Sequence, residues 1–64
     1  MTPIVTYDPE VDAAYIRFST GHVRESEEVT PGIVLDYDAD GRIVGMEVLD
    51  AKRHLPSDVL IAAA

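Results

Sequence analysis

Apolar and polar residues alternate along most of the chain, and short turn-forming segments interrupt the alternation. The clearest example is residues 32–49, GIVLDYDADGRIVGMEVL, in which two alternating apolar runs flank the tetrapeptide at 38–41. Alternation on both sides of an acidic turn that ends in Gly is typical of a β-hairpin. We therefore expect this hairpin to be the element around which the rest of the chain is organised.

Three further strands are predicted before the hairpin. Residues 4–7, IVTY, are rich in β-branched and aromatic side chains, and the Asp-Pro-Glu segment at 8–10 is typical of a turn. Residues 13–18 form either a second strand or part of a helix over 11–17, because Ala-Ala favours a helix; the β-rich sequence YIRF favours the strand. Residues 22–30 alternate without a fully apolar side, which indicates a solvated strand at the sheet edge.

The alternation does not determine the register of the hairpin. If its loop has four residues around a type I turn, Tyr37 pairs with Arg42, and the apolar sets of the two strands meet on one face. If Gly41 instead forms a bulge, Asp38 pairs with Arg42 and the two sets separate. These sets are Ile33, Leu35 and Tyr37 on one strand, and Val44, Met46 and Val48 on the other. A shift of one residue therefore changes the predicted core.

The alternation stops after Leu49. Residues 50–55 suit a short helical turn with Asp50 as its N-cap, and Pro56 ends it. A second helical segment follows at 58–63 with Ser57 as its cap, and its apolar residues at 59–61 are expected to pack on the sheet or on another subunit. The predicted fold is mainly β (α+β), a single domain over residues 1–64. It consists of a small antiparallel β-meander sheet of about five strands with a short C-terminal helix.

Chain length limits the core that this domain can build. With 64 residues, it buries about 60% of the surface that its unfolded chain exposes. Chains this short are often stabilised by a disulfide, a metal or a partner subunit. The absence of cysteine excludes a disulfide. Because 47% of the residues are hydrophobic but only 6% are aromatic, we expect a small aliphatic core that extends across a homodimer interface.

The net charge of the chain limits the classes of molecule that it is expected to bind. Twelve acidic residues against five basic ones give a net charge of −7, which disfavours binding to nucleic acid and is compatible with a basic protein partner. The opening MTPIVTYDPE lacks the pattern of a signal peptide, and the apolar run at 59–64 is too short to cross a bilayer. We expect a cytoplasmic protein with no membrane association.

One motif matches a calcium-binding loop by spacing. Asp36, Asp38 and Asp40, followed by Gly41 and then by Glu47, satisfy the EF-hand pattern of oxygen ligands. The pattern needs flanking helices, whereas Pro-Gly at 31–32 and the β-branched residues after the loop favour strands. In an extended strand Glu47 lies roughly 20 Å from Gly41, beyond a shared coordination shell. We therefore interpret the motif as an acidic turn, with a small ligand- or divalent-metal-binding module as the alternative function.

Other polar side chains supply no catalytic pattern. Those considered are Ser19, Ser26 and Ser57; His22 and His54; Asp8, Glu10 and Asp12; Tyr7, Tyr15 and Tyr37; and Arg17. The serines lack a nucleophile elbow, the histidines lack metal-ligand spacing, and His54 is expected to contact the carbonyls at a helix end. The tyrosines are expected to pack, and Arg17 to form an ion pair if an acid faces it. We predict no enzyme, and no catalytic, cofactor-binding or metal-binding residues. An enzyme using Asp8, Asp12 and Tyr15 would need a pocket between subunits.

Two blocks of the sequence resemble a known family. Residues 7–19, YDPEVDAAYIRFS, and residues 27–51, EEVTPGIVLDYDADGRIVGMEVLDA, resemble the domain of unknown function 2283 family, a small and mainly bacterial group. The resemblance spans residues 4–55 and implies a small antiparallel β-domain with a short C-terminal helix and no assigned catalytic residues. It also implies that some members are encoded beside small toxin-like proteins. The leading hypothesis is a non-enzymatic homodimeric protein-interaction module, antitoxin-like in its sharper form.

Overall fold

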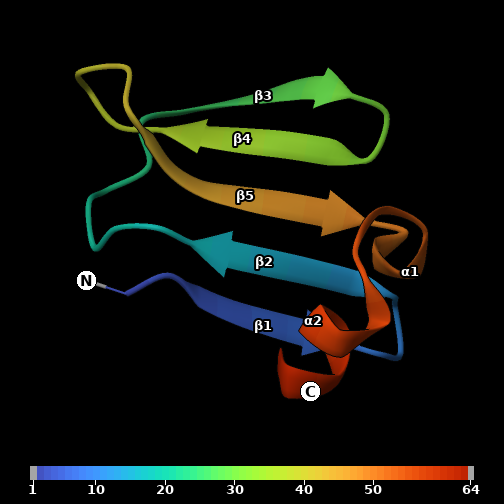
Figure 1. Cartoon of the computed structure of the whole chain (residues 1–64). Helices are drawn as coiled ribbons and strands as arrows, with labels where there is room; N and C mark the ends of the chain where they lie inside the picture. Colours follow the sequence, from blue (N-terminus) through green and yellow to red (C-terminus); the bar gives the residue numbers. More distant parts are fainter. Residues whose placement is uncertain (1, 64) are drawn as a thin grey trace.

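The computed structural model describes residues 2–63, which form one sheet with two short helices on one side (Figure 1). The elements are β1 (Ile4–Asp8), β2 (Ala13–Arg17), β3 (Glu25–Thr30), β4 (Ile33–Tyr37), β5 (Ile43–Leu49), α1 (Ala51–His54) and α2 (Ser57–Ala63). Each predicted strand is present, and residues 13–17 form a strand rather than a helix. Neither helix is long and apolar enough to cross a membrane.

All five strands are antiparallel to their neighbours, in the order β1-β2-β5-β4-β3. The prediction of a mainly β fold with a five-stranded antiparallel sheet and C-terminal helical structure is confirmed. Hairpins join β1 to β2, and β3 to β4 to β5, but β2 and β3 are not neighbours, so the strand order departs from the predicted meander at this one connection. The segment between them passes the ends of β5 and β4 (Figure 1), which places β5 in the centre of the sheet.

The register of the central hairpin combines features of both predicted alternatives. The Asp38 backbone N–H donates to the Arg42 carbonyl oxygen at 2.9 Å, so these two residues pair as in the bulged alternative. Tyr37 then pairs with Ile43, but Asp36 pairs with Gly45, which leaves Val44 as an extra residue on β5. This bulge shifts the rest of the hairpin by one residue. Ile33 therefore pairs with Val48, and the apolar sets meet on one face of the sheet.

Strand β3 is the solvated edge that the alternation predicts. Every one of its six residues is exposed, and a bulge at Val29 interrupts its pairing with β4. Pro31 and Gly32 form the two-residue turn into β4, and Gly32 has a φ of 87°, as the third position of a type II turn requires. Charged side chains on such an edge oppose pairing with another sheet.

The register divides the strand residues between two faces, because partners in an antiparallel pair share a face. We call one the apolar face: Val5, Tyr7, Ala14, Ile16, Ile33, Leu35, Tyr37, Ile43, Met46 and Val48, with Glu25, Glu27 and Thr30 of β3 at its edge. We call the other the polar face: Ile4, Thr6, Asp8, Ala13, Tyr15, Arg17, Ser26, Glu28, Val34, Asp36, Gly45, Glu47 and Leu49.

The core lies where the helices meet the apolar face. Ala14, Val48, Ala51 and Leu60 form one buried cluster, with Tyr7, Ile33, Met46 and Leu55 packed against it. Leu60 of α2 is 6% exposed while its neighbour Ile61 is 76% exposed. One part of the predicted apolar tail therefore packs on the sheet of its own chain, and another part faces outward. In Figure 1, α2 lies across β1, and no helix of residues 2–63 lies across β4 or β3.

The start of α1 differs from the prediction. Asp50 occupies the N-cap position, but its backbone is left-handed (φ 51°, ψ 51°) and its side chain makes no cap hydrogen bond. Asp12 caps the helix instead: its carbonyl oxygen accepts from the Ala51 N–H at 2.9 Å, and its Oδ1 accepts from the Lys52 N–H at 3.1 Å. The helix N-terminus is therefore tied to the turn between β1 and β2. For α2, Ser57 is the first helical residue rather than the residue before it.

Candidate functional site

A tyrosine on the polar face reaches across a whole strand to an aspartate. Tyr15 lies on β2 and Asp36 on β4, with Gly45 of β5 between them. The Tyr15 hydroxyl donates to Asp36 Oδ2 at 2.6 Å. Its ring occupies the space over Gly45: a Cβ atom added there would lie 2.6 Å from Tyr15 Cζ. Only glycine at position 45 leaves room for this contact.

The same aspartate continues the connection to the sheet edge. Ser26 of β3 donates from its Oγ to Asp36 Oδ1 at 2.6 Å, so each carboxylate oxygen accepts a hydroxyl hydrogen bond. The hydrogen bond to Asp36, together with burial and the negative charge of Asp36, raises the pKa of Tyr15 above its ordinary value of 10.0. The phenol is therefore a neutral donor at physiological pH. The two hydrogen bonds that Asp36 accepts, from Tyr15 and from Ser26, are suited to holding strands together rather than to exchanging protons.

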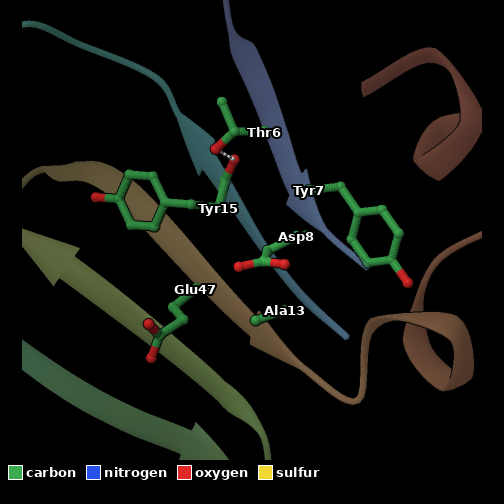
Figure 2. A pocket seen from close by; sticks show the side chains of 7 residues that line it. Thr6, Tyr7, Asp8, Ala13, Tyr15 and Glu47 are labelled. Atoms are coloured by element: carbon green, nitrogen blue, oxygen red, sulfur yellow. Dashed lines mark hydrogen bonds between the residues drawn. The ribbon is translucent and has the colours of Figure 1, made fainter. Parts of the chain in front are cut away.

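A hollow lies beside Tyr15 on the polar face (Figure 2). It has a volume of about 220 Å³ and is bordered on this face by Thr6, Asp8, Ala13, Tyr15 and Glu47. Because the Tyr15 ring leans over Gly45 and Ala13 has only a methyl group, the strand surface between β1 and β5 stays open. Figure 2 shows the Asp8 and Glu47 carboxylates on the same side of the sheet, on the strands that flank β2.

The sheet separates Asp12 from the other two residues of the hypothetical active site, because Asp8 and Tyr15 both border the hollow on the polar face. The Tyr7 hydroxyl donates to Asp12 Oδ1 at 2.7 Å, on the side of the sheet that the helices occupy, whereas Tyr15 bonds to Asp36 on the polar face. The hydrogen bond to Asp12 is the largest cause of the raised pKa of Tyr7. Asp8 accepts the Glu10 N–H at 3.0 Å, as a turn aspartate does. Asp8, Asp12 and Tyr15 therefore do not converge on one pocket within this chain.

The residues of the calcium-like motif are likewise engaged separately. Asp38 Oδ1 accepts the backbone N–H groups of Asp40 and Arg42, both at 2.9 Å, and so organises the turn. Asp36 faces Tyr15 and Ser26, while Glu47 borders the hollow. Within residues 2–63 no group of three or more His, Asp or Glu side chains is placed to hold a metal ion. Titration with calcium remains the direct test of the metal-binding alternative.

Three of the remaining predicted candidates, His54, Ser19 and Arg17, make structural contacts. His54 Nδ1 lies 3.0 Å from the Leu49 carbonyl oxygen and 3.2 Å from that of Asp50, so it contacts carbonyls before α1 rather than those at its end. Ser19 Oγ accepts the Gly21 N–H at 3.0 Å. Arg17 donates to the Gly21 carbonyl oxygen at 3.3 Å, and its cross-strand neighbours are Ile4 and Gly45. The predicted ion pair is therefore not made with a cross-strand neighbour.

Tyr37 contacts the edge strand on the apolar face. Its hydroxyl lies 3.4 Å from Glu27 Oε1, and burial together with the charge of Glu27 raises its pKa. All three tyrosines thus donate toward a carboxylate, which sequence reasoning missed. The Tyr15–Asp36 pair depends on which strands are neighbours, whereas the Tyr7–Asp12 pair spans one turn and the Tyr37–Glu27 pair lies within one hairpin.

A second candidate surface is the part of the apolar face that the helices do not cover. We call it the open apolar surface: half-buried Ile16, Leu35 and Met46, together with Phe18, which continues β2 and is 38% exposed. The Phe18 N–H donates to the Val44 carbonyl oxygen at 2.9 Å, so the sheet pairing extends to this residue. The surface crosses three adjacent strands, β2, β5 and β4.

Comparison with known proteins gives one match. A family model described as "Protein of unknown function (DUF2283)" matches residues 4–52, close to the span of the resemblance noted above. No curated protein and no solved structure matches the chain.

Proposed function

The chain belongs to the DUF2283 family of proteins of unknown function, and we propose that it is a non-enzymatic protein-interaction module that works as a homodimer. The observation that supports this proposal is the open apolar surface. Only one end of the apolar face is covered by α1 and α2, so Ile16, Leu35 and Met46 remain half-buried at the middle of the sheet.

The exposed area of the chain supports the same proposal. The chain exposes 4481 Å², compared with about 4,000 Å² for a typical folded monomer of this mass. It measures 32 × 27 × 17 Å, so it is thin in the direction in which a second layer would pack. A standard interface buries about 800 Å² per partner, and a second copy on the open apolar surface would supply the missing layer.

The border of this surface suits an interface. Glu25 and Glu27 of β3 pair with Tyr37 and Leu35, and so lie beside the open apolar surface at the sheet edge. Both glutamates are exposed. An apolar centre with a charged, solvated rim is the usual arrangement of a protein–protein interface. In a two-fold dimer the same patch of each copy forms both halves of the contact.

Sedimentation equilibrium tests this proposal. We expect a particle of twice 7.0 kDa at micromolar concentration, and a monomer for the Phe18→Glu variant. Leu49→Glu is the matched control, because Leu49 is 40% exposed, against 38% for Phe18, but lies on the polar face. Circular dichroism establishes that both variants fold. A folded, monomeric wild-type chain at these concentrations would contradict the proposal.

In its sharper form, the module is an acidic, antitoxin-like partner of a small basic protein. The net charge of −7 supports a basic partner. Co-expression with the product of a neighbouring gene is the test, and we expect the two to elute together from a sizing column at low salt and to separate as salt is raised. Separate elution at low salt would overturn this form and leave the homodimer untouched.

A further inference from the structure

The polar face is the surface that stays accessible when two copies pair through the apolar face. Its charged residues are four acids, Asp8, Glu28, Asp36 and Glu47, and one base, Arg17. Asp36 is engaged by two hydroxyl groups, and Arg17 donates to the Gly21 carbonyl oxygen. The acids that remain open toward solvent include the two that border the hollow.

The size of the hollow limits its occupant. At about 220 Å³ it is smaller than the sites of roughly 300–1,000 Å³ that take drug-sized ligands. It is open on one side, with the strand backbone of β1, β2 and β5 as its floor. These dimensions suit a single side chain that enters from another molecule.

The lining determines the chemistry of that side chain. Within residues 2–63 no Lys, Arg or His borders the hollow, whereas Asp8 and Glu47 place carboxylates on opposite sides of β2. Both residues are exposed, so each side chain can turn toward an entering cation. A positive charge is attracted by both carboxylates at once.

Apolar surface beside the two carboxylates also suits a long basic side chain. The Tyr15 ring forms one wall, and Leu49, 40% exposed, follows Glu47 on the same face. Long basic side chains pack their methylene groups on apolar surface while their charged heads reach polar groups. An aromatic ring also attracts a cation placed over its face.

We propose that this hollow binds a lysine or arginine side chain of a basic protein partner, between Asp8 and Glu47 and against the Tyr15 ring. The inference rests on the proposed interaction module and assigns the partner to the face opposite the homodimer contact. The Tyr15–Asp36 hydrogen bond holds the ring over Gly45 and so keeps the hollow open.

The experiment is a heteronuclear NMR titration of the whole chain with tetralysine amide at low salt, with fully acetylated tetralysine as the uncharged probe. We expect the largest shifts at the amides of Ala13, Tyr15 and Glu47, and none with the acetylated probe. The double variant Asp8→Asn, Glu47→Gln is expected to bind about tenfold more weakly, since two exposed ion pairs are lost. Asn at position 8 retains the Oδ1 that accepts the Glu10 N–H.

A charge-matched control separates the hollow from the general acidity of the chain. Glu28→Gln, Asp40→Asn removes two exposed carboxylates that border neither the hollow nor the open apolar surface, and is expected to keep the wild-type affinity. Equal weakening in both double variants, or shifts spread over β3 and the acidic turn, would overturn the inference. Sedimentation of the same samples separates the two proposals. Dimers that do not bind tetralysine overturn this inference alone, whereas a monomer that binds it at the hollow supports the inference and overturns the homodimer.

Discussion

At the scale of single residues, Asp12 connects more of the molecule than any local pattern indicates. It holds the left-handed backbone conformation that Asp tolerates better than most residues (φ 53°). Its Oδ1 accepts from the Tyr7 hydroxyl and the Lys52 N–H, and its carbonyl oxygen accepts from the Ala51 N–H. The first hairpin and the first helix are therefore joined through one side chain.

Replacing Asp12 with alanine is expected to destabilise the fold strongly. The change removes a helix cap and the hydrogen bond from the half-buried Tyr7 hydroxyl. It also places alanine, whose side chain forms no local hydrogen bonds, in the left-handed region. Asp50→Ala is the matched control, because Asp50 has nearly the same φ but makes no side-chain cap bond. We expect Asp12→Ala to lower the free energy of unfolding by about 2 kcal/mol more than Asp50→Ala does. Urea unfolding measures both; equal losses would show that only backbone strain matters.

The tyrosines make the free energy of unfolding depend on pH in the alkaline range. The pKa of Tyr15 is raised above 10.0 in the folded chain, so the folded state favours the neutral phenol relative to the unfolded state. The resulting contribution is fully present below pH 10 and is lost as the pH rises through the folded pKa. We expect the free energy of unfolding to fall above pH 10, and to fall less steeply in Tyr15→Phe.

Urea unfolding below and above pH 10 tests this dependence. Some decline is expected to persist in Tyr15→Phe, because Tyr7 and Tyr37 also have raised pKa values. An identical slope for the wild-type chain and Tyr15→Phe would contradict a role for the Asp36 hydrogen bond in the titration.

At the scale of the elements, the central strand β5 lacks a side chain at Gly45, and the Tyr15 ring of the neighbouring strand β2 occupies that space. Gly45 lies in the middle of β5, where glycine is ordinarily unfavourable, and is buried beneath the Tyr15 ring. The absence of a side chain there lets β2 contact β4 directly. The Tyr15–Asp36 hydrogen bond thus joins β2 to β4, two strands that share no backbone pairing. Ser26 extends the connection from Asp36 to β3.

Gly45→Ala is expected to cost about 2 kcal/mol, because the new methyl group displaces the Tyr15 ring and breaks its hydrogen bond to Asp36. In a Tyr15→Ala background the obstacle is absent, and the same change is expected to be neutral or slightly stabilising. Thermal unfolding of the four chains forms a double-mutant cycle. Additive effects would show that the ring and the glycine do not interact.

The elements were predictable because each strand has its own alternation and each turn its own Gly, Pro or Asp. The pairing was less predictable. The extra residue Val44 moves the register after the turn has closed, and no sequence pattern distinguishes that bulge from a regular strand. Asp50 has the sequence signature of an N-cap, yet the cap comes from Asp12, which is 38 residues away and adjacent only in the folded sheet. The candidate site was hidden for the same reason, since Tyr15 meets Asp36 only after the strand order is known.

At the scale of the whole molecule, the covering of the sheet is incomplete. Two short helices pack over one end of the apolar face, while Ile16, Phe18 and Leu35 neither belong to the buried core cluster nor pack against it. A chain of this size gains little from its own core alone. The proposed self-association would therefore contribute to the stability of the fold as well as to its function.

The midpoint of thermal unfolding is therefore expected to rise with protein concentration. Mass action stabilises a dimer as the total concentration increases, and a tenfold increase is expected to raise the midpoint by about 4 °C. The Phe18→Glu variant is expected to unfold at one temperature whatever its concentration. Differential scanning calorimetry over that range makes the comparison. A wild-type midpoint that does not change with concentration would contradict self-association.

The strand order also has a consequence for synthesis. Strand β5 lies between β2 and β4, although it is the last strand in the sequence. As the chain leaves the ribosome from its N-terminus, the β1–β2 hairpin and the β3–β4 hairpin emerge as two separate ribbons with nothing between them. Each isolated two-stranded ribbon is at best marginally stable in water. The sheet therefore assembles only after residues 43–49 have been made, and a nascent chain that stalls earlier exposes two unpaired strand edges.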